Sequence, residues 1–273
     1  MDTIIIDGLS FALPLFIIAI GGIYSEKSGI TNLALEGFQG FGAFTGALAA
    51  VLIANALGTD IQNLFYVALL FAMLGGMAFS VIHAVLSIKF KADQVISGVV
   101  INILALALTT FLTTQINSLV FGTASDKFQL GVSQRFTIEW LADIPVIGAI
   151  FTNVYPFEVI IVVIAVFAWY LLYKTRYGMR LRACGENPHS VDTAGVDVAK
   201  IRFSAVLVSG LLSGLGGMCF AYSISANFSS SIYMGYGFLA IAALIFGNWR
   251  IVPTLAACLL FGFAKSGGAF IAQ

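Results

Sequence analysis

Charged side chains are scarce in this chain of 273 residues. Asp, Glu, Lys and Arg make up only 10% of it and cancel to a formal net charge of zero, whereas hydrophobic residues make up 60%. Soluble domains carry about 25% charged residues, which coat a surface that faces water. A surface in contact with membrane lipid needs none, so the composition predicts an integral membrane protein. The balanced charge gives no support to a nucleic-acid partner.

Residues that carry enzyme chemistry are equally sparse. The two histidines, His83 and His189, are far apart, the three cysteines lack CxxC or metal-ligand spacing, and there is no paired-carboxylate or Ser/His/Asp pattern. No GxxxxGK[ST] phosphate loop occurs, so any ATP chemistry must reside on another polypeptide. We predict that the chain is not an enzyme and holds no metal or cofactor of its own.

Apolar runs fill most of the chain. A spanning helix needs about 20 mostly apolar residues, and we count about eight such runs, the seventh of them short. They lie near Ile4–Tyr24, Gly29–Ala54, Leu64–Ile88, Val95–Ile116, Phe157–Tyr173, Phe203–Tyr222, Tyr233–Phe246 and Ile251–Phe270. Unpaired backbone groups are costly in hydrocarbon, so the runs must be helical. The sequence therefore predicts an all-α, polytopic transmembrane bundle that forms a single domain over residues 1–273.

The basic residues predict the orientation of this bundle. Nearly half of the 13 Lys and Arg lie in the loop 174–202, and cytoplasmic loops are enriched in these residues. Counting spans from this loop places the loop 118–156 outside the cell. It also places the N-terminus outside, where Asp2 and Asp7 occur without a nearby base. The missing basic residues also argue against a cleaved signal peptide, so the first run is a retained span.

The cytoplasmic loop contains the pattern of one short helix. Asn187 suits the N-cap, Pro188 the first helical position and Gly195 the position after the end. A helix of about two turns is marginal in water and needs a surface on which to dock. Two interpretations remain open. The segment is either a coupling helix that sits in a groove of an ATPase subunit or an amphipathic helix lying on lipid headgroups.

The second run contains a carboxylate. Asn32, Glu36 and Gln39 are spaced i, i+4 and i+7, which predicts one polar face of a helix. A carboxylate in a membrane is costly unless paired, so Glu36 is a candidate functional residue. It is also expected near the cytoplasmic end, where it could accept backbone N–H groups of a neighbouring broken helix. We favour this structural role and expect the polar face to point inward.

The fourth run contains Asn102, which offers a donor and an acceptor to a crossing solute. The alternative is a hydrogen bond between helices, worth about 0.6–2 kcal/mol. The short seventh run looks like a partial span, tolerable where it is buried against protein or lines a cavity. Small residues four positions apart predict close helix packing. These pairs are Gly42 and Gly46, Gly210 and Gly214, and Ser213 and Gly217.

Four motifs in this order resemble the sugar, nucleoside and branched-chain amino acid permeases of bacterial ABC importers. They are the segment 22–37, Ile96-Ser97-Gly98 with Asn102, the loop from Gly185-Glu186-Asn187-Pro188 to Ala194-Gly195, and the segment from Gly237-Phe238 to Gly247. The resemblance covers about residues 8 to 265. The Asn-Leu-Ala-Leu-Glu-Gly form at 32–37 is most similar to the nucleoside-type permeases, especially the shorter of their two paired subunits.

This resemblance implies a permease subunit in the bacterial plasma membrane, surrounded by lipid, that imports a small molecule. It implies three partners: an ATP-binding subunit that carries ATP and Mg, a second permease, and an extracellular substrate-binding lipoprotein. The outer loop near Ile144–Gly148 would face that lipoprotein. Nucleosides are the implied substrate, with ribose-like sugars or branched-chain amino acids as alternatives. A self-contained secondary carrier or channel is the alternative from another class.

The resemblance also assigns the motif residues. It favours the coupling helix for the segment that contains Gly185, Glu186, Asn187, Pro188, Val191, Ala194 and Gly195. We further predict that Asn32, Gln39, Ser97 and Asn102 face the translocation path and that Glu36 braces it. The end at Gln273 falls short of the usual length of the family, which is consistent with a truncated C-terminus.

Overall fold

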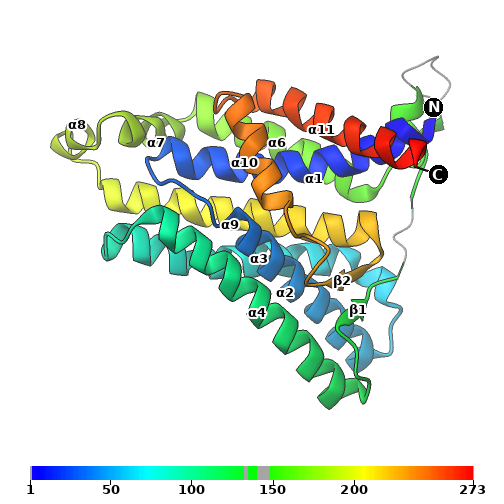
Figure 1. Cartoon of the computed structure of the whole chain (residues 1–273). Helices are drawn as coiled ribbons and strands as arrows, with labels where there is room; N and C mark the ends of the chain where they lie inside the picture. The colour runs from blue at the N-terminus through cyan, green and yellow to red at the C-terminus, as the bar shows by residue number, and fades with distance from the viewer. Residues whose placement is uncertain (1, 132–134, 140–147, 273) are drawn as a thin grey trace.

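The helices lie mostly along one direction and cross the molecule repeatedly from end to end (Figure 1). This computed structural model describes residues 2–131, 135–139 and 148–272. Among these residues, seven helices are long and apolar enough to cross a membrane. They are α1 (Asp2–Lys27), α2 (Leu35–Leu57), α3 (Phe65–Ala84), α4 (Gln94–Phe121), α6 (Pro156–Lys174), α9 (Val198–Ile224) and α11 (Ile251–Ile271). The predicted polytopic helical bundle is thus confirmed.

The shorter elements lie between these helices. Helix α3 is preceded by the 3-10 turn η1 (Ile61–Leu64) and continues into the π-helical turn η2 (Val85–Lys89). The others are η3 (Gly148–Phe151), α7 (Arg176–Glu186), α8 (Pro188–Thr193), α10 (Tyr236–Phe246), β1 (Lys127–Gln129) and β2 (Asn227–Ser229). The two strands form a small antiparallel ribbon in which Phe128 lies opposite Phe228. Helix α10 is the short seventh run, and its 11 residues are too few to span a bilayer alone.

The two ends of the molecule differ in what they carry. Helices α7 and α8 project from one end, and the junction between α1 and α2 lies at that end (Figure 1). The N-terminus, the end of α11 and the β1–β2 ribbon lie toward the opposite end. The basic loop and the acidic N-terminus are therefore separated by the length of the bundle. Which end faces the cytoplasm stays a prediction.

Close packing of backbones holds the centre of the bundle together. A Cβ atom added to Gly214 of α9 would lie 2.2 Å from the carbonyl oxygen of Ala72 in α3. One added to Gly42 of α2 would lie 2.4 Å from the Cα of Gly214. Helices α2, α3 and α9 therefore meet without intervening side chains, which confirms the packing role predicted for the small residues. Helices α4 and α11 lie at the periphery and leave most of their residues at least partly exposed.

One predicted span begins later than its apolar run. The run at Gly29–Ala54 predicts a helix from its start, but α2 begins at Leu35 and the segment 28–34 is not helical. Gly29 has a φ of +89°, a left-handed conformation that suits glycine. The Asn32 side chain accepts a hydrogen bond from the Ala34 N–H, a local bond that competes with helix formation. Hydropathy cannot detect either feature.

Candidate functional site

Two non-helical segments interrupt the bundle. One is the segment 28–34, which joins α1 to α2, and the other is the segment 230–235, which joins the β ribbon to α10. Their backbone groups lack the partners that a helix would supply, and unpaired groups are costly in a membrane. Side chains from α2, α3, α4 and α9 provide these partners. Most of the polar residues selected from the sequence serve this purpose.

Asn102 of α4 bonds the unpaired backbone groups at the start of α2. Its Nδ2 donates to the carbonyl oxygen of Leu33 at 2.8 Å, and its Oδ1 accepts from the N–H of Gly37 at 2.7 Å. Both backbone groups are left unpaired by the break before α2. The hydrogen bond between elements, one of the two interpretations of Asn102, is thus present. A contact between Asn102 and a solute remains a prediction.

Glu36 caps the start of α10. Its Oε2 accepts from the N–H of Gly235 at 2.9 Å. The N-terminus of a helix carries partial positive charge and unpaired N–H groups, so a carboxylate is stabilised there. This is the bond to a neighbouring broken helix that we favoured for Glu36. The start of α2 and the start of α10 are therefore joined by one side chain.

Asn32 and Gln39 lie deep inside the subunit. Both are fully buried. Asn32 donates to the Ser209 hydroxyl of α9 at 2.9 Å, and Gln39 donates to the carbonyl oxygen of Tyr233 at 2.9 Å. The prediction that Asn32 shares a helical face with Glu36 and Gln39 is wrong, because Asn32 precedes the helix. The buried Gln39 Oε1 has no hydrogen-bond partner among the described residues.

Ser97 belongs to a cluster that the sequence did not identify. Its hydroxyl lies 2.9 Å from Nδ1 of His83, whose Nε2 lies 3.3 Å from the carbonyl oxygen of Thr31. A carbonyl can only accept, so Nε2 carries the proton and Nδ1 accepts from Ser97. Gln94 adds its Oε1, which accepts from the N–H of Thr31 at 2.7 Å. A histidine within an apolar run was the available signal for this cluster.

A surface depression brings Glu36 and Asn102 together. It has a volume of about 200 Å³ and is lined by Glu36, Val99, Asn102, Ile103, Leu106, Tyr233, Met234 and Phe238. We call it the α4–α10 depression. Phe238 and Ile103 are exposed beside it, whereas Tyr233 is buried. Of the five predicted path residues, Glu36 and Asn102 line this depression, and Asn32, Gln39 and Ser97 are not among its lining residues.

The basic loop folds as two helices. Helix α8 has the predicted caps: Asn187 Oδ1 accepts from the N–H of Ser190 at 3.1 Å, Pro188 is the first residue, and Gly195 follows with a φ of +78°. The prediction that this short helix is the one helix of the loop is wrong, because α7 precedes it and ends with Gly185 and Glu186. Asn187 adopts an extended conformation with a φ of −147°, which breaks the helix there.

Most residues of this loop are exposed. Gly185, Glu186, Asn187, Ala194 and Gly195 are exposed, and Val191 is buried. After α8, Asp197 caps α9 by accepting from the N–H of Lys200 at 3.0 Å. That hydrogen bond, together with the Lys200 ammonium 3.1 Å from the carboxylate, lowers the pKa of Asp197. The loop therefore contains a capped helix that is exposed at the surface.

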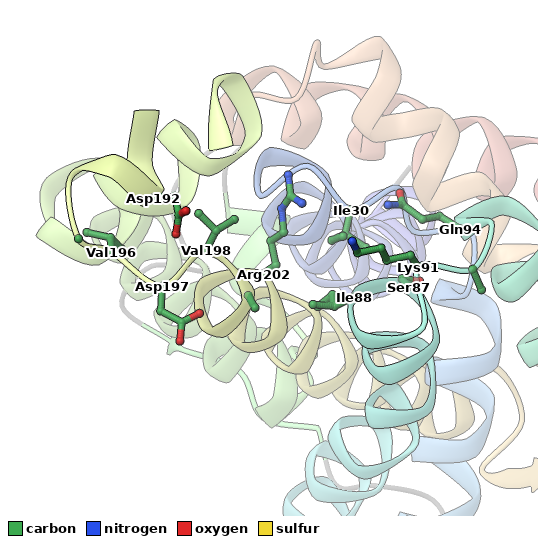
Figure 2. A pocket seen from close by; sticks show the side chains of 13 residues that line it. Ile30, Ser87, Ile88, Lys91, Gln94, Asp192, Val196, Asp197, Val198 and Arg202 are labelled. Carbon is green, nitrogen blue, oxygen red and sulfur yellow. The ribbon is translucent and has the colours of Figure 1, made fainter. Parts of the chain in front are cut away.

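A groove runs beside α8 at the same end of the molecule (Figure 2). Its volume is about 840 Å³. Its walls come from η2 and the turn after it, from the start of α9, and from the segment 28–34 through Ile30. Asp192, Asp197, Lys91 and Arg202 give it charges of both signs. The groove thus connects the exposed loop with the non-helical segment before α2.

Almost the whole chain matches one family model. Residues 4–273 match the model described as "Branched-chain amino acid transport system / permease component". The chain belongs to this permease family. It is therefore a multi-pass membrane subunit of an ABC transport system in the bacterial plasma membrane, and the substrate of its own system is considered below.

Curated relatives of the permease carry more specific names. It is 42% identical to the "Guanosine ABC transporter permease protein NupQ" of Bacillus subtilis, over 94% of this chain and 79% of the relative. It is 39% identical to the "Nucleoside ABC transporter permease protein NupC" of Lactococcus lactis, over 97% of this chain and 82% of the relative. The "Putative glucose ABC transporter permease protein TsgC13" of Haloferax volcanii is 28% identical, over 92% and 72%. No solved structure matches the permease.

The relatives named above are transport-system permeases, and the absence of enzymatic activity in this chain stays a prediction. Among the described residues, no group of three or more His, Cys, Asp or Glu side chains could hold a metal ion. The predicted lipoprotein-facing segment at Ile144–Ile147 lies outside the described residues.

Proposed function

We propose that this permease forms one side of the translocation path for nucleosides in an ATP-driven importer. The observation that carries the proposal is its similarity, at 42% and 39% identity over almost the whole chain, to permeases named for guanosine and for nucleosides. Sugar-type relatives are more distant, since the one named for glucose is 28% identical. Ribose-like sugars and branched-chain amino acids are therefore the second choices.

The α4–α10 depression supports a nucleoside as the solute. A nucleoside combines a flat base with hydroxyl donors. Phe238 offers an exposed ring on which a base can stack. Glu36 uses one carboxylate oxygen for Gly235 and retains lone pairs that can accept from a sugar hydroxyl. We assign direct contact to Glu36, Asn102 and Phe238, and assign Asn32, Gln39 and Ser97 to the support of the path from behind.

The partners of this importer are also part of the proposal. A separate ATP-binding subunit would bind ATP and Mg and dock on the exposed loop from Gly185 to Gly195. A second, different permease would complete the path. The relatives support a pair of two different permeases. Bacillus subtilis has two proteins named guanosine permeases, and this chain is 42% identical to NupQ and 26% identical to NupP. A substrate-binding lipoprotein would deliver the nucleoside from outside.

Transport assays in the native cells test the substrate. Deletion of the gene should abolish high-affinity uptake of labelled guanosine, and the restored gene should recover it. Unlabelled adenosine or uridine should compete, whereas ribose and leucine at the same concentration should not. Competition by ribose or leucine alone, with no effect of nucleosides, would reassign the substrate to sugars or amino acids.

A mild-detergent purification of the tagged permease tests the class of transporter. We expect an ATP-binding subunit, a second permease and a lipoprotein to copurify, and mass spectrometry would identify them. Purification of the permease alone, together with uptake that depends on an ion gradient and not on ATP, would support a self-contained carrier instead.

A further inference from the structure

Arg202 joins the exposed loop to the non-helical segment before α2. It lies in the first turns of α9, and Figure 2 shows its side chain rising from that helix at the wall of the groove. Its Nε donates to the carbonyl oxygen of Ser28 at 3.0 Å. Its Nη2 donates to the carbonyl oxygen of Cys184 at 3.3 Å. One guanidinium therefore bridges the end of α7 and the segment that follows α1.

The geometry of this bridge suits arginine and not lysine. Cys184 lies in the last turn of α7, where carbonyl groups have no partner within the helix and carry partial negative charge. Ser28 directly follows the end of α1, a second helix C-terminus. A planar guanidinium presents several donors in a fixed fork and can serve both carbonyls at once, whereas an ammonium is a point charge on a flexible stem.

Backbone contact reinforces the bridge. A Cβ atom added to Gly185 would lie 2.3 Å from the carbonyl oxygen of Lys27 and 3.3 Å from the nitrogen of Gly29. A Cβ atom added to Gly29 would lie 2.9 Å from Nη2 of Arg202. The end of α7, the end of α1 and the guanidinium thus pack without intervening side chains. A displacement of α7 must be transmitted to the segment 28–34 or break this contact.

The far end of the same segment reaches the α4–α10 depression. Asn102, which lines the depression, holds the carbonyl oxygen of Leu33. Glu36 follows at the start of α2 and caps α10 through Gly235. The segment 28–34 is therefore held by Arg202 at one end and by Asn102 at the other. It connects the loop that we expect the ATP-binding subunit to move with the surface that we expect the solute to touch.

We propose that Arg202 is a positioning residue that couples movement of α7 and α8 to the translocation path. The inference rests on the proposed ATP-driven import. It requires the segment 28–34 to adopt different positions in the two states of the transporter, and both the ATP-binding subunit and the solute to bias that choice. Loss of the bridge should leave ATP hydrolysis running while fewer solutes are moved.

The test uses the complex that copurifies with the tagged permease, reconstituted in proteoliposomes with its lipoprotein. Labelled guanosine uptake and ATP hydrolysis are measured in the same vesicles for wild type, Arg202→Lys and Arg180→Lys. Arg180 is an exposed residue of α7 and serves as the matched control. For R202K we expect normal recovery of the complex, ATP hydrolysis within about twofold of wild type, and about tenfold less guanosine per ATP, a typical size for coupling between sites. R180K should match wild type in both assays.

The outcomes separate this inference from the proposed function. An absence of ATP-dependent guanosine uptake by the wild-type complex would overturn both. If the wild-type complex takes up guanosine normally and R202K transports as much guanosine per ATP hydrolysed as wild type does, the coupling role alone is overturned. If R202K does not assemble, Arg202→Gln is measured in the same way. Failure of both variants to assemble, with R180K intact, would make Arg202 an ordinary folding residue and overturn its coupling role.

Discussion

At the scale of single residues, polar side chains in this permease mainly satisfy broken backbone. Asn102, Glu36, Gln39 and Gln94 each bond a main-chain group in one of the two non-helical segments. In hydrocarbon such groups have no water to bond, so each side chain is required where the helix is interrupted. The same residues would be expensive in an unbroken span. Their presence in apolar runs therefore marks the interruptions.

Asn102→Leu should destabilise the permease. The change leaves the carbonyl oxygen of Leu33 and the N–H of Gly37 without their partner, at about 1–3 kcal/mol for each group. Thermal denaturation of the purified complex, followed by loss of monodisperse protein, would measure the effect. The control is Thr110→Val on the same helix, because the Thr110 hydroxyl is exposed and bonds only a carbonyl of its own helix. Equal melting of the two variants would contradict the capping role of Asn102.

Phe238→Ala should weaken nucleoside transport without uncoupling it. Stacking of a base on an aromatic ring is worth about 1–3 kcal/mol by alanine substitution, so KM for guanosine should rise about tenfold or more. ATP hydrolysis and recovery of the complex should not change. Phe246→Ala is the matched control, since Phe246 is an exposed residue at the other end of α10 and does not line the depression. An unchanged KM for F238A would remove Phe238 from the proposed contact surface.

At the scale of helices, spans were predictable and their interruptions were not. The apolar runs at Val95–Ile116 and Phe157–Tyr173 correspond to α4 and α6, because hydrocarbon selects for length and hydrophobicity. The start of α2 was misplaced, because Gly29 and Asn32 favour local turns within an apolar run. The cap at Asn187 was recognised, but α7 before it was not.

Gly214→Ala should disrupt the packing of α3 against α9. The added methyl group would lie 2.2 Å from the carbonyl oxygen of Ala72, and overpacking of this kind costs about 1–3 kcal/mol. The melting temperature of the purified complex should fall. Gly267→Ala on α11 is the control, because no atom beyond the backbone of its own helical turns lies within 4 Å of the added methyl group there. If both variants have the melting temperature of the wild type, the backbone contact is not important for stability.

At the scale of the whole molecule, the two ends differ in the charge they carry. The basic loop of α7 and α8 lies at one end, and the acidic N-terminus lies at the other (Figure 1). Helices α4 and α11 expose apolar faces along their length, which lipid or the second permease can cover. The α4–α10 depression opens on the surface partly formed by α4. We therefore expect the second permease to face this side.

The predicted orientation can be tested by labelling introduced cysteines with an impermeant maleimide. Glu186→Cys in the α7–α8 loop should react only after the membrane is permeabilised. Asp60→Cys, in the turn after α2, should react in intact cells. The natural cysteines, Cys184, Cys219 and Cys258, are buried and should give little background. The opposite pattern would reverse the orientation that the Lys and Arg bias predicts.

The sequence by itself determined the environment, the class and the main elements of this permease. The hydrocarbon core of the membrane requires apolar side chains, runs of about 20 residues and a fully paired backbone, so a bundle of helices follows from composition and run length. The motifs at 32–37 and 185–195 also indicated its family and the exposed loop. Only the tertiary structure decided that Asn102 and Glu36 share a depression with Phe238, and that Arg202 reaches Ser28 and Cys184. These contacts join residues far apart in the chain, and their distances depend on how the helices pack, which no local pattern of residues encodes.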